Sequence, residues 1–218
     1  MTMLGLGTAW FIRGFLAAVF FVLGGLMWRK SSEIKITRMT SLFFVAWGMF
    51  FTALNVVFGL QTYGVLPGKY LPVGLALAHL FAFVSVGYLW RSITVLFYAK
   101  YEDYWKYIAG WGAVVLLLSI GVVTGTVPVM PFRMGIMAGF WLPGLALGVI
   151  GYRSASEVSG AEKYKLYLMT TGALWGMLVS STTNNLRIGP MNGMWANLPW
   201  MALFVAAIWW DQVKEIAW

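Results

Sequence analysis

Seven apolar stretches separated by short linkers make up nearly all of this chain of 218 residues. Each stretch is roughly 16 to 29 residues long, and about 20 apolar residues in a helix cross the hydrocarbon core of a bilayer. With 61% hydrophobic and 10% charged residues, the sequence predicts an all-α protein in which residues 1–218 form a single bundle of seven transmembrane helices. The stretches are Ala9–Trp28, Met39–Leu60, Tyr70–Tyr98, Tyr107–Val123, Met134–Tyr152, Leu166–Thr183 and Trp195–Trp210.

Basic residues alternate between the linkers and predict the orientation. The first, third and fifth linkers hold three or four Lys or Arg each, whereas Lys69, Arg133 and Arg187 stand alone in the second, fourth and sixth. The positive-inside rule therefore predicts a plasma-membrane protein with its N-terminus outside and its C-terminus in the cytoplasm. The third span is expected to end at Trp90, with Arg91 at the cytoplasmic edge. The net charge of +8 fits this topology and contact with anionic lipid, not nucleic acid binding.

The sequence lacks the residues that most membrane-embedded chemistry requires. There is no cysteine, and His79 is the only histidine, so iron–sulfur clusters, paired haem ligands and multi-histidine metal sites are excluded. All seven acidic residues lie in linkers or at the end of the last stretch, and no nucleophile–base–acid set is recognisable. We therefore expect no enzymatic activity, no metal site and no cofactor.

The first three and the last three stretches share several short patterns. Trp-Gly-Met occurs at 47–49 and at 175–177, and an asparagine follows each tryptophan eight or nine residues later (Asn55 and Asn184). A chain with 13 Trp, 13 Met and 25 Gly also produces such matches by chance, so an internal duplication and coincidence both stay open. Parallel repeats would cover 9–98 and 133–214, with 107–123 as the linking helix.

This arrangement of three helices, one linking helix and three helices resembles the SWEET and PQ-loop carriers in length, helix count and orientation. The resemblance implies a facilitative small-solute transporter. Those families carry proline motifs in their repeat helices, whereas the first, second and sixth stretches of this chain contain no proline. No residue is therefore transferred from them.

Polar side chains within the spans concentrate in the predicted outer half of the membrane. A polar group in lipid is costly unless it is paired, so a shared depth suggests an outward-facing ligand pocket. The alternative interpretation is that these groups bond helix to helix, and that Arg13 extends to the lipid headgroups. The candidate ligand residues are Arg13, Asn55, His79, Asn184 and Asn185.

Small residues predict close helix contacts in the fifth stretch. Gly135 and Gly139 form one small-xxx-small step, and Gly144 and Gly148 form a second. These glycines are expected to pack the helix within the bundle or against a partner.

The function expected from these features is that of a non-catalytic multi-pass protein. It would be an accessory or scaffold subunit of a membrane complex, or would bind a small or lipid-like ligand from the outer side. The alternative is the facilitative carrier described above. The expected partners are the lipid bilayer and, for a subunit, other membrane proteins or further copies of this chain.

Overall fold

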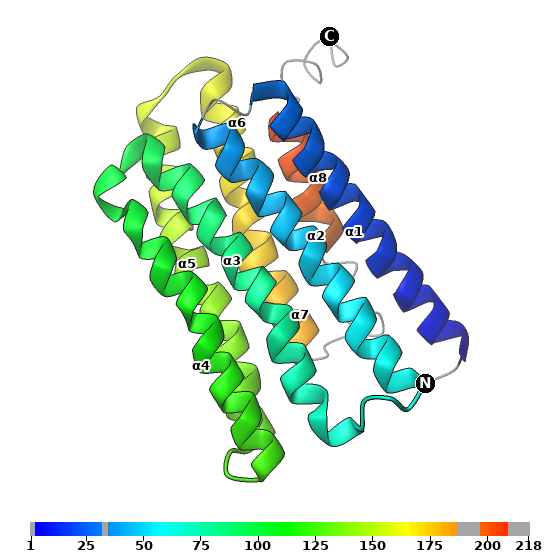
Figure 1. Ribbon diagram of the computed structural model, residues 1–218. Helices are drawn as coiled ribbons and strands as arrows, with labels where there is room; N and C mark the ends of the chain where they lie inside the picture. Colours follow the sequence, from blue (N-terminus) through cyan, green and yellow to red (C-terminus); the bar gives the residue numbers. More distant parts are fainter. Residues whose placement is uncertain (1–2, 32–34, 187–196, 209–218) are drawn as a thin grey trace. The chain divides into compact units, whose positions relative to one another are not determined.

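The computed structural model describes residues 3–31, 35–186 and 197–208, and these residues contain helices and no strand (Figure 1). Two short 3₁₀ helices, η1 and η2, flank α3, and a π-helical turn, η3, joins α6 to α7. The elements are α1 (Met3–Ser31), α2 (Lys35–Thr62), η1 (Gly68–Tyr70), α3 (Leu71–Phe97), η2 (Ala99–Tyr104), α4 (Trp105–Thr124), α5 (Val129–Glu157), α6 (Gly160–Leu174), η3 (Trp175–Ser180), α7 (Ser181–Leu186) and α8 (Asn197–Ile208).

Five helices are long and apolar enough to cross a membrane, one in each of the first five predicted stretches. The sixth predicted span falls on α6, η3 and α7, which follow one another without a break from Gly160 to Leu186. The seventh falls on α8, a shorter apolar helix, and its flanking residues lie outside the described part of the chain. The structure is therefore all-helical in its described residues, with five candidate membrane spans, and the count of seven spans stays a prediction.

The ends of two helices bear on the predicted topology. α3 runs from Leu71 to Phe97, within the predicted stretch Tyr70–Tyr98, and Arg91, the expected cytoplasmic edge of the span, lies inside this helix and is paired with Glu102. α5 begins at Val129, which places Arg133 inside the helix and not in a linker. Pro131 then lies in the first turn, where a missing N–H is tolerated.

The chain divides into two compact units, Met1–Gly139 and Phe140–Trp218. In the first unit α1 packs on α2, α2 on α3 and α3 on α4, as the blue-to-green helices of Figure 1 show. In the second unit α6 and η3 pack on α8. Consecutive helices are therefore spatial neighbours in the first unit, as short connections require.

Aromatic rings fill the interface between α1 and α2. The fully buried Phe20 ring lies 6.0 Å from that of Phe44 and 5.8 Å from that of Phe51, two residues that share a face of α2. The Ser41 hydroxyl donates a 2.7 Å hydrogen bond to the Gly24 carbonyl on α1. These contacts supply the dispersion and polar terms that hold helices together in lipid, where burial from water contributes little.

The first glycine pair of α5 lies against α3 and α4. A Cβ atom on Gly135 would come within 2.7 Å of Leu118 Cδ1, and one on Gly139 within 2.4 Å of Phe83 Cε1 and 2.5 Å of Trp111 Cδ1. The Trp111 indole also donates a 2.8 Å hydrogen bond to the Gly135 carbonyl. The absence of side chains therefore allows this close approach.

The second glycine pair belongs to the other unit and lies against α6 and η3. A Cβ atom on Gly144 would lie 2.8 Å from Met177 Cβ, and one on Gly148 would lie 2.7 Å from Leu174 Cδ2. α5 thus presents glycines to different neighbours in its two halves.

Candidate ligand-binding site

Arg13 and Asn55, two of the predicted ligand residues, lie in the same region of the α1–α2 interface. The Asn55 Nδ2 donates a 3.2 Å hydrogen bond to the Trp10 carbonyl, one turn before Arg13 on α1. The Arg13 guanidinium lies 4.5 Å from the centroid of the Phe58 ring, one turn after Asn55 on α2. Because side chains on a helix lean toward its N-terminus, Arg13 extends toward the end of α2 that closes at Thr62.

The contact with Trp10 determines which way the Asn55 amide points. A carbonyl accepts and cannot donate, so the atom that faces Trp10 O is the Nδ2 amide and not Oδ1. Gly14 lies beside this contact, and even a Cβ there would remain 3.7 Å from Nδ2. The other amide atom, Oδ1, is buried, and no residue that the structure describes forms a hydrogen bond with it.

Arg13 is a buried cation with no acidic side chain in the neighbouring helices. Only 7% of its surface is exposed, and its Nε is buried with no hydrogen-bond partner in the described part of the chain. Helices α1, α2 and α3 contain no Asp or Glu. The face of Phe58 stabilises the guanidinium by about 1–2 kcal/mol, which does not replace a counter-ion, because burying an unpaired charge costs several kcal/mol.

His79 lies on α3, against a different face of α2. Its Nδ1 is 2.7 Å from the Leu75 carbonyl, so this nitrogen carries the proton and donates within its own helix. Its ring centroid is 5.0 Å from that of Phe50, whereas Arg13 and Asn55 contact the α1-facing side of α2. These described contacts place His79 in the α2–α3 packing.

Asn184 and Asn185 lie in α7, in the second unit, and their side chains are outside the described part of the structure. Their inclusion in the ligand site therefore stays a prediction. The neighbouring hydroxyls bond back to their own helix: Ser181 to the Met177 carbonyl and Thr182 to the Leu178 carbonyl. Thr182 also accepts a 3.1 Å hydrogen bond from the Trp141 indole on α5.

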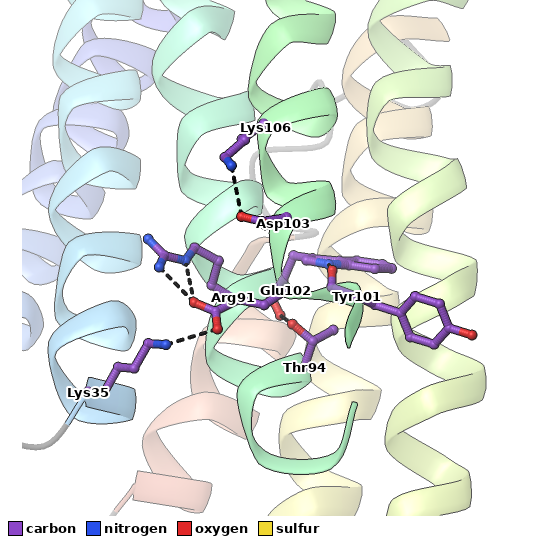
Figure 2. A network of polar contacts seen from close by, with 8 residues as sticks. Lys35, Arg91, Thr94, Tyr101, Glu102, Asp103 and Lys106 are labelled. Atoms are coloured by element: carbon purple, nitrogen blue, oxygen red, sulfur yellow. Dashed lines mark hydrogen bonds and ion pairs between the residues drawn. The ribbon is translucent and has the colours of Figure 1, made fainter. Parts of the chain in front are cut away.

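A cluster of ion pairs at the other end of α2 was not predicted from the sequence (Figure 2). The Glu102 carboxylate of η2 accepts bonds from Lys35 Nζ at 2.9 Å and from Arg91 Nη2 at 2.7 Å. The Arg91 guanidinium also lies 5.3 Å from the Trp105 ring centroid. The cluster joins the start of α2, the end of α3 and the segment before α4.

The only sign of this cluster in the sequence is the acidic pair Glu102-Asp103 within the basic third linker.

The two cations also affect the ionisation of Glu102. Lys35 and Arg91 hold the pKa of Glu102 below its ordinary value, chiefly through the hydrogen bond from Lys35 and then that from Arg91. Glu102 lies in the connection between α3 and α4, beside the charged Lys100 and Asp103, as expected of an interfacial segment. The network also shows that the first and third linkers meet at one end of the first unit.

Replacing Glu102 by glutamine should lower the free energy of unfolding by about 1 kcal/mol, because Lys35 and Arg91 lose a shared counter-charge while part of each side chain stays exposed. Asp103→Asn is the matched control; its pair with Lys106 is 79% and 62% exposed, and no measurable change is expected. The contribution of Glu102 is complete above its ordinary pKa of 4.5 and is lost as the pH falls through the lowered value. The melting temperatures of wild type and Glu102→Gln should therefore differ at pH 7 and converge in acid. A difference in melting temperature that stays constant with pH would contradict the ion-pair account.

No protein-family model matches the sequence, and comparison with curated proteins and with solved structures finds no match. Within residues 3–31, 35–186 and 197–208, no group of three or more His, Asp or Glu side chains could hold a metal ion.

Proposed function

We propose that this protein is a non-catalytic, seven-span membrane protein that binds an anionic, lipid-like ligand between α1 and α2 from the outer side. The observation that carries the proposal is Arg13, a buried cation whose Nε lacks a partner and whose neighbouring helices contain no carboxylate. Such a charge is stable in lipid when an anion reaches it. The ligand supplies that anion.

The depth of Arg13 and Asn55 in the membrane supports a ligand that comes from the bilayer. α2 has 28 residues, or about 42 Å at 1.5 Å per residue, close to the thickness of a bilayer with its headgroups. Asn55 lies seven residues before the end of α2 at Thr62, which is about 10 Å along the helix. This depth corresponds to the boundary between headgroups and acyl chains, where an arginine meets lipid phosphate.

The internal repeat and the count of seven spans are part of this proposal. The interval from Trp175 to Asn184 is one residue longer than that from Trp47 to Asn55, and the π-helical turn η3 falls within it. A π-turn accommodates one extra residue, which would restore the phase of the two asparagines. Burial differs at the two tryptophans: Trp47 is buried and Trp175 is 38% exposed.

The carrier alternative has less support than the binding protein. A carrier needs polar lining that is reachable from both sides of the membrane. At the end of α3 opposite the Arg13 site, Ser92 and Thr94 are buried and donate to the carbonyls of Leu89 and Trp90. These hydroxyls are used within their own helix, so they give no support for a polar lining at this end of α3.

Arg13→Met tests the proposal because the two interpretations predict opposite changes in stability. If Arg13 serves a ligand, methionine removes an unpaired buried charge, and the unfolding free energy of ligand-free protein in detergent should rise by about 1 kcal/mol or more. The same variant should lose the thermal stabilisation that short-chain phosphatidylglycerol gives to wild type.

Arg29→Met is the control, since Arg29 is exposed near the other end of α1; its melt and its response to lipid should match wild type. If Arg13→Met lowers the stability of the ligand-free protein and leaves the response to lipid intact, Arg13 is a structural residue and the proposed function is wrong.

A further inference from the structure

We propose that the ligand is a phospholipid whose headgroup carries a hydrogen-bond donor beside its phosphate, a hydroxyl or an ammonium group. This inference rests on the proposed function and assigns the chemistry of the headgroup. It follows from two atoms of opposite hydrogen-bonding character that adjoin the same turns of α1 and α2. Arg13 Nε donates, Asn55 Oδ1 accepts, and both are buried without a hydrogen-bond partner among the described residues.

Arg13 selects the anionic part of the headgroup. A guanidinium has donors and no acceptor, and its fork matches the oxygens of a phosphate. At about 10 Å from the end of α2, the anions that a bilayer offers are the phosphates of its lipids. The Phe58 ring covers the guanidinium at 4.5 Å and leaves Nε unpaired.

Asn55 selects the donor. Its Nδ2 is bonded to the Trp10 carbonyl, so the amide cannot turn over without setting two acceptors against each other. Oδ1 is therefore an acceptor at a fixed place, and a buried acceptor left unpaired costs free energy. A ligand with both phosphate and donor satisfies Arg13 and Asn55, whereas a phosphate ester without a donor satisfies Arg13 alone.

The surroundings favour a lipid over a free phosphate compound. Trp10 is 42% exposed, and Val56 and Leu60 are 53% and 40% exposed on the same stretch of α2. In a bilayer these apolar side chains face acyl chains. A lipid tail can lie along them while its headgroup reaches Arg13 and Asn55, and a soluble phosphate ester has no group for this surface.

The test compares headgroups on identical short acyl chains by thermal stabilisation of the purified protein in mild detergent. Phosphatidylglycerol carries hydroxyls, phosphatidylethanolamine an ammonium, and phosphatidylcholine no donor. Wild type should bind the first two about tenfold more tightly than phosphatidylcholine, as expected for one unpaired buried acceptor. Glycerol 3-phosphate, a phosphate monoester that carries hydroxyls but no acyl tails, should give little stabilisation; an equal effect would overturn the lipid assignment.

Two variants of Asn55 separate the donor requirement from folding. Asn55→Leu should bind all three lipids with similar affinity, and Asn55→Asp should lose them all, because a negative charge near Arg13 opposes the binding of a phosphate. Thr52→Val is the control, since the Thr52 hydroxyl donates to the Gly48 carbonyl on the exposed side of the same helix; it should keep the wild-type preference.

The outcomes distinguish this inference from the function on which it rests. If wild type binds phosphatidylcholine as tightly as the other lipids and Arg13→Met abolishes all binding, the donor requirement is wrong and the ligand site stands. If Arg13→Met binds every lipid as wild type does, the proposed function fails and the headgroup inference fails with it. Should Asn55→Leu not fold, the headgroup series on wild type and Asn55→Asp still decides the question.

Discussion

Replacing Gly139 by leucine is expected to destabilise the protein by about 3 kcal/mol, at the upper end of the usual cost of overpacking. Even a Cβ at this position would lie 2.4 Å from Phe83 Cε1 and 2.5 Å from Trp111 Cδ1. Phe83 is fully buried, and its Cδ2 would also lie 3.4 Å from a Cβ on Gly112 of α4, so its ring has little room to move. Displacing Trp111 would also break its hydrogen bond to the Gly135 carbonyl.

The matched control is Gly110→Leu, because nothing lies within 4 Å of a Cβ at Gly110 in α4. Thermal melts in detergent should show a large fall for Gly139→Leu and little change for Gly110→Leu. Equal shifts at the two positions would contradict this account. The loss of stability would then come from replacing a helical glycine, and not from the close approach of α5 to α3 and α4.

Reporter fusions should give all-or-none signals that alternate between the linkers. A reporter placed after Lys35 or after Trp218 should report the cytoplasm, and one placed after Lys69 should report the outside. The bonds of Glu102 to Lys35 and Arg91 give this prediction a structural basis, because the first and third linkers lie at the same end of the first unit. Lys69 follows the opposite end of α2.

Lys35→Gln, which leaves the other basic residues of the first linker in place, is the control fusion and should keep the wild-type signals. An outside signal from the reporter after Trp218 would contradict an odd number of spans. An outside signal after Lys35 would reverse the orientation and place the Arg13 site at the cytoplasmic face.

The existence of the long helices could be predicted because length and hydropathy are properties of the sequence alone. The ion-pair partner of Arg91 could not be predicted in the same way. Arg91 was expected at the membrane edge, and it is paired with Glu102, eleven residues later in the sequence and adjacent in space. Such a pairing depends on the turn made by η2, which hydropathy does not reveal.

For the candidate site, the depth of each residue in the membrane could be predicted, but not the direction in which it faces. Depth along each helix grouped Arg13, Asn55 and His79, but depth does not say which face of α2 meets which neighbour. Asn55 shares its face with Phe51 and lies toward α1, whereas Phe50, one residue earlier than Phe51, lies toward His79 on α3. One residue is about 100° of helix rotation, and both faces are apolar, so the two faces cannot be distinguished from the sequence.

Native mass spectrometry of the protein released from mild detergent tests the central claim most directly. Wild type should retain a phosphate-bearing lipid, Arg13→Met should lose it, and Arg29→Met should retain it as wild type does. The account would be contradicted by a wild-type protein that carries no lipid from a phospholipid-containing preparation, or by an Arg13→Met variant that retains the same lipid at the same occupancy.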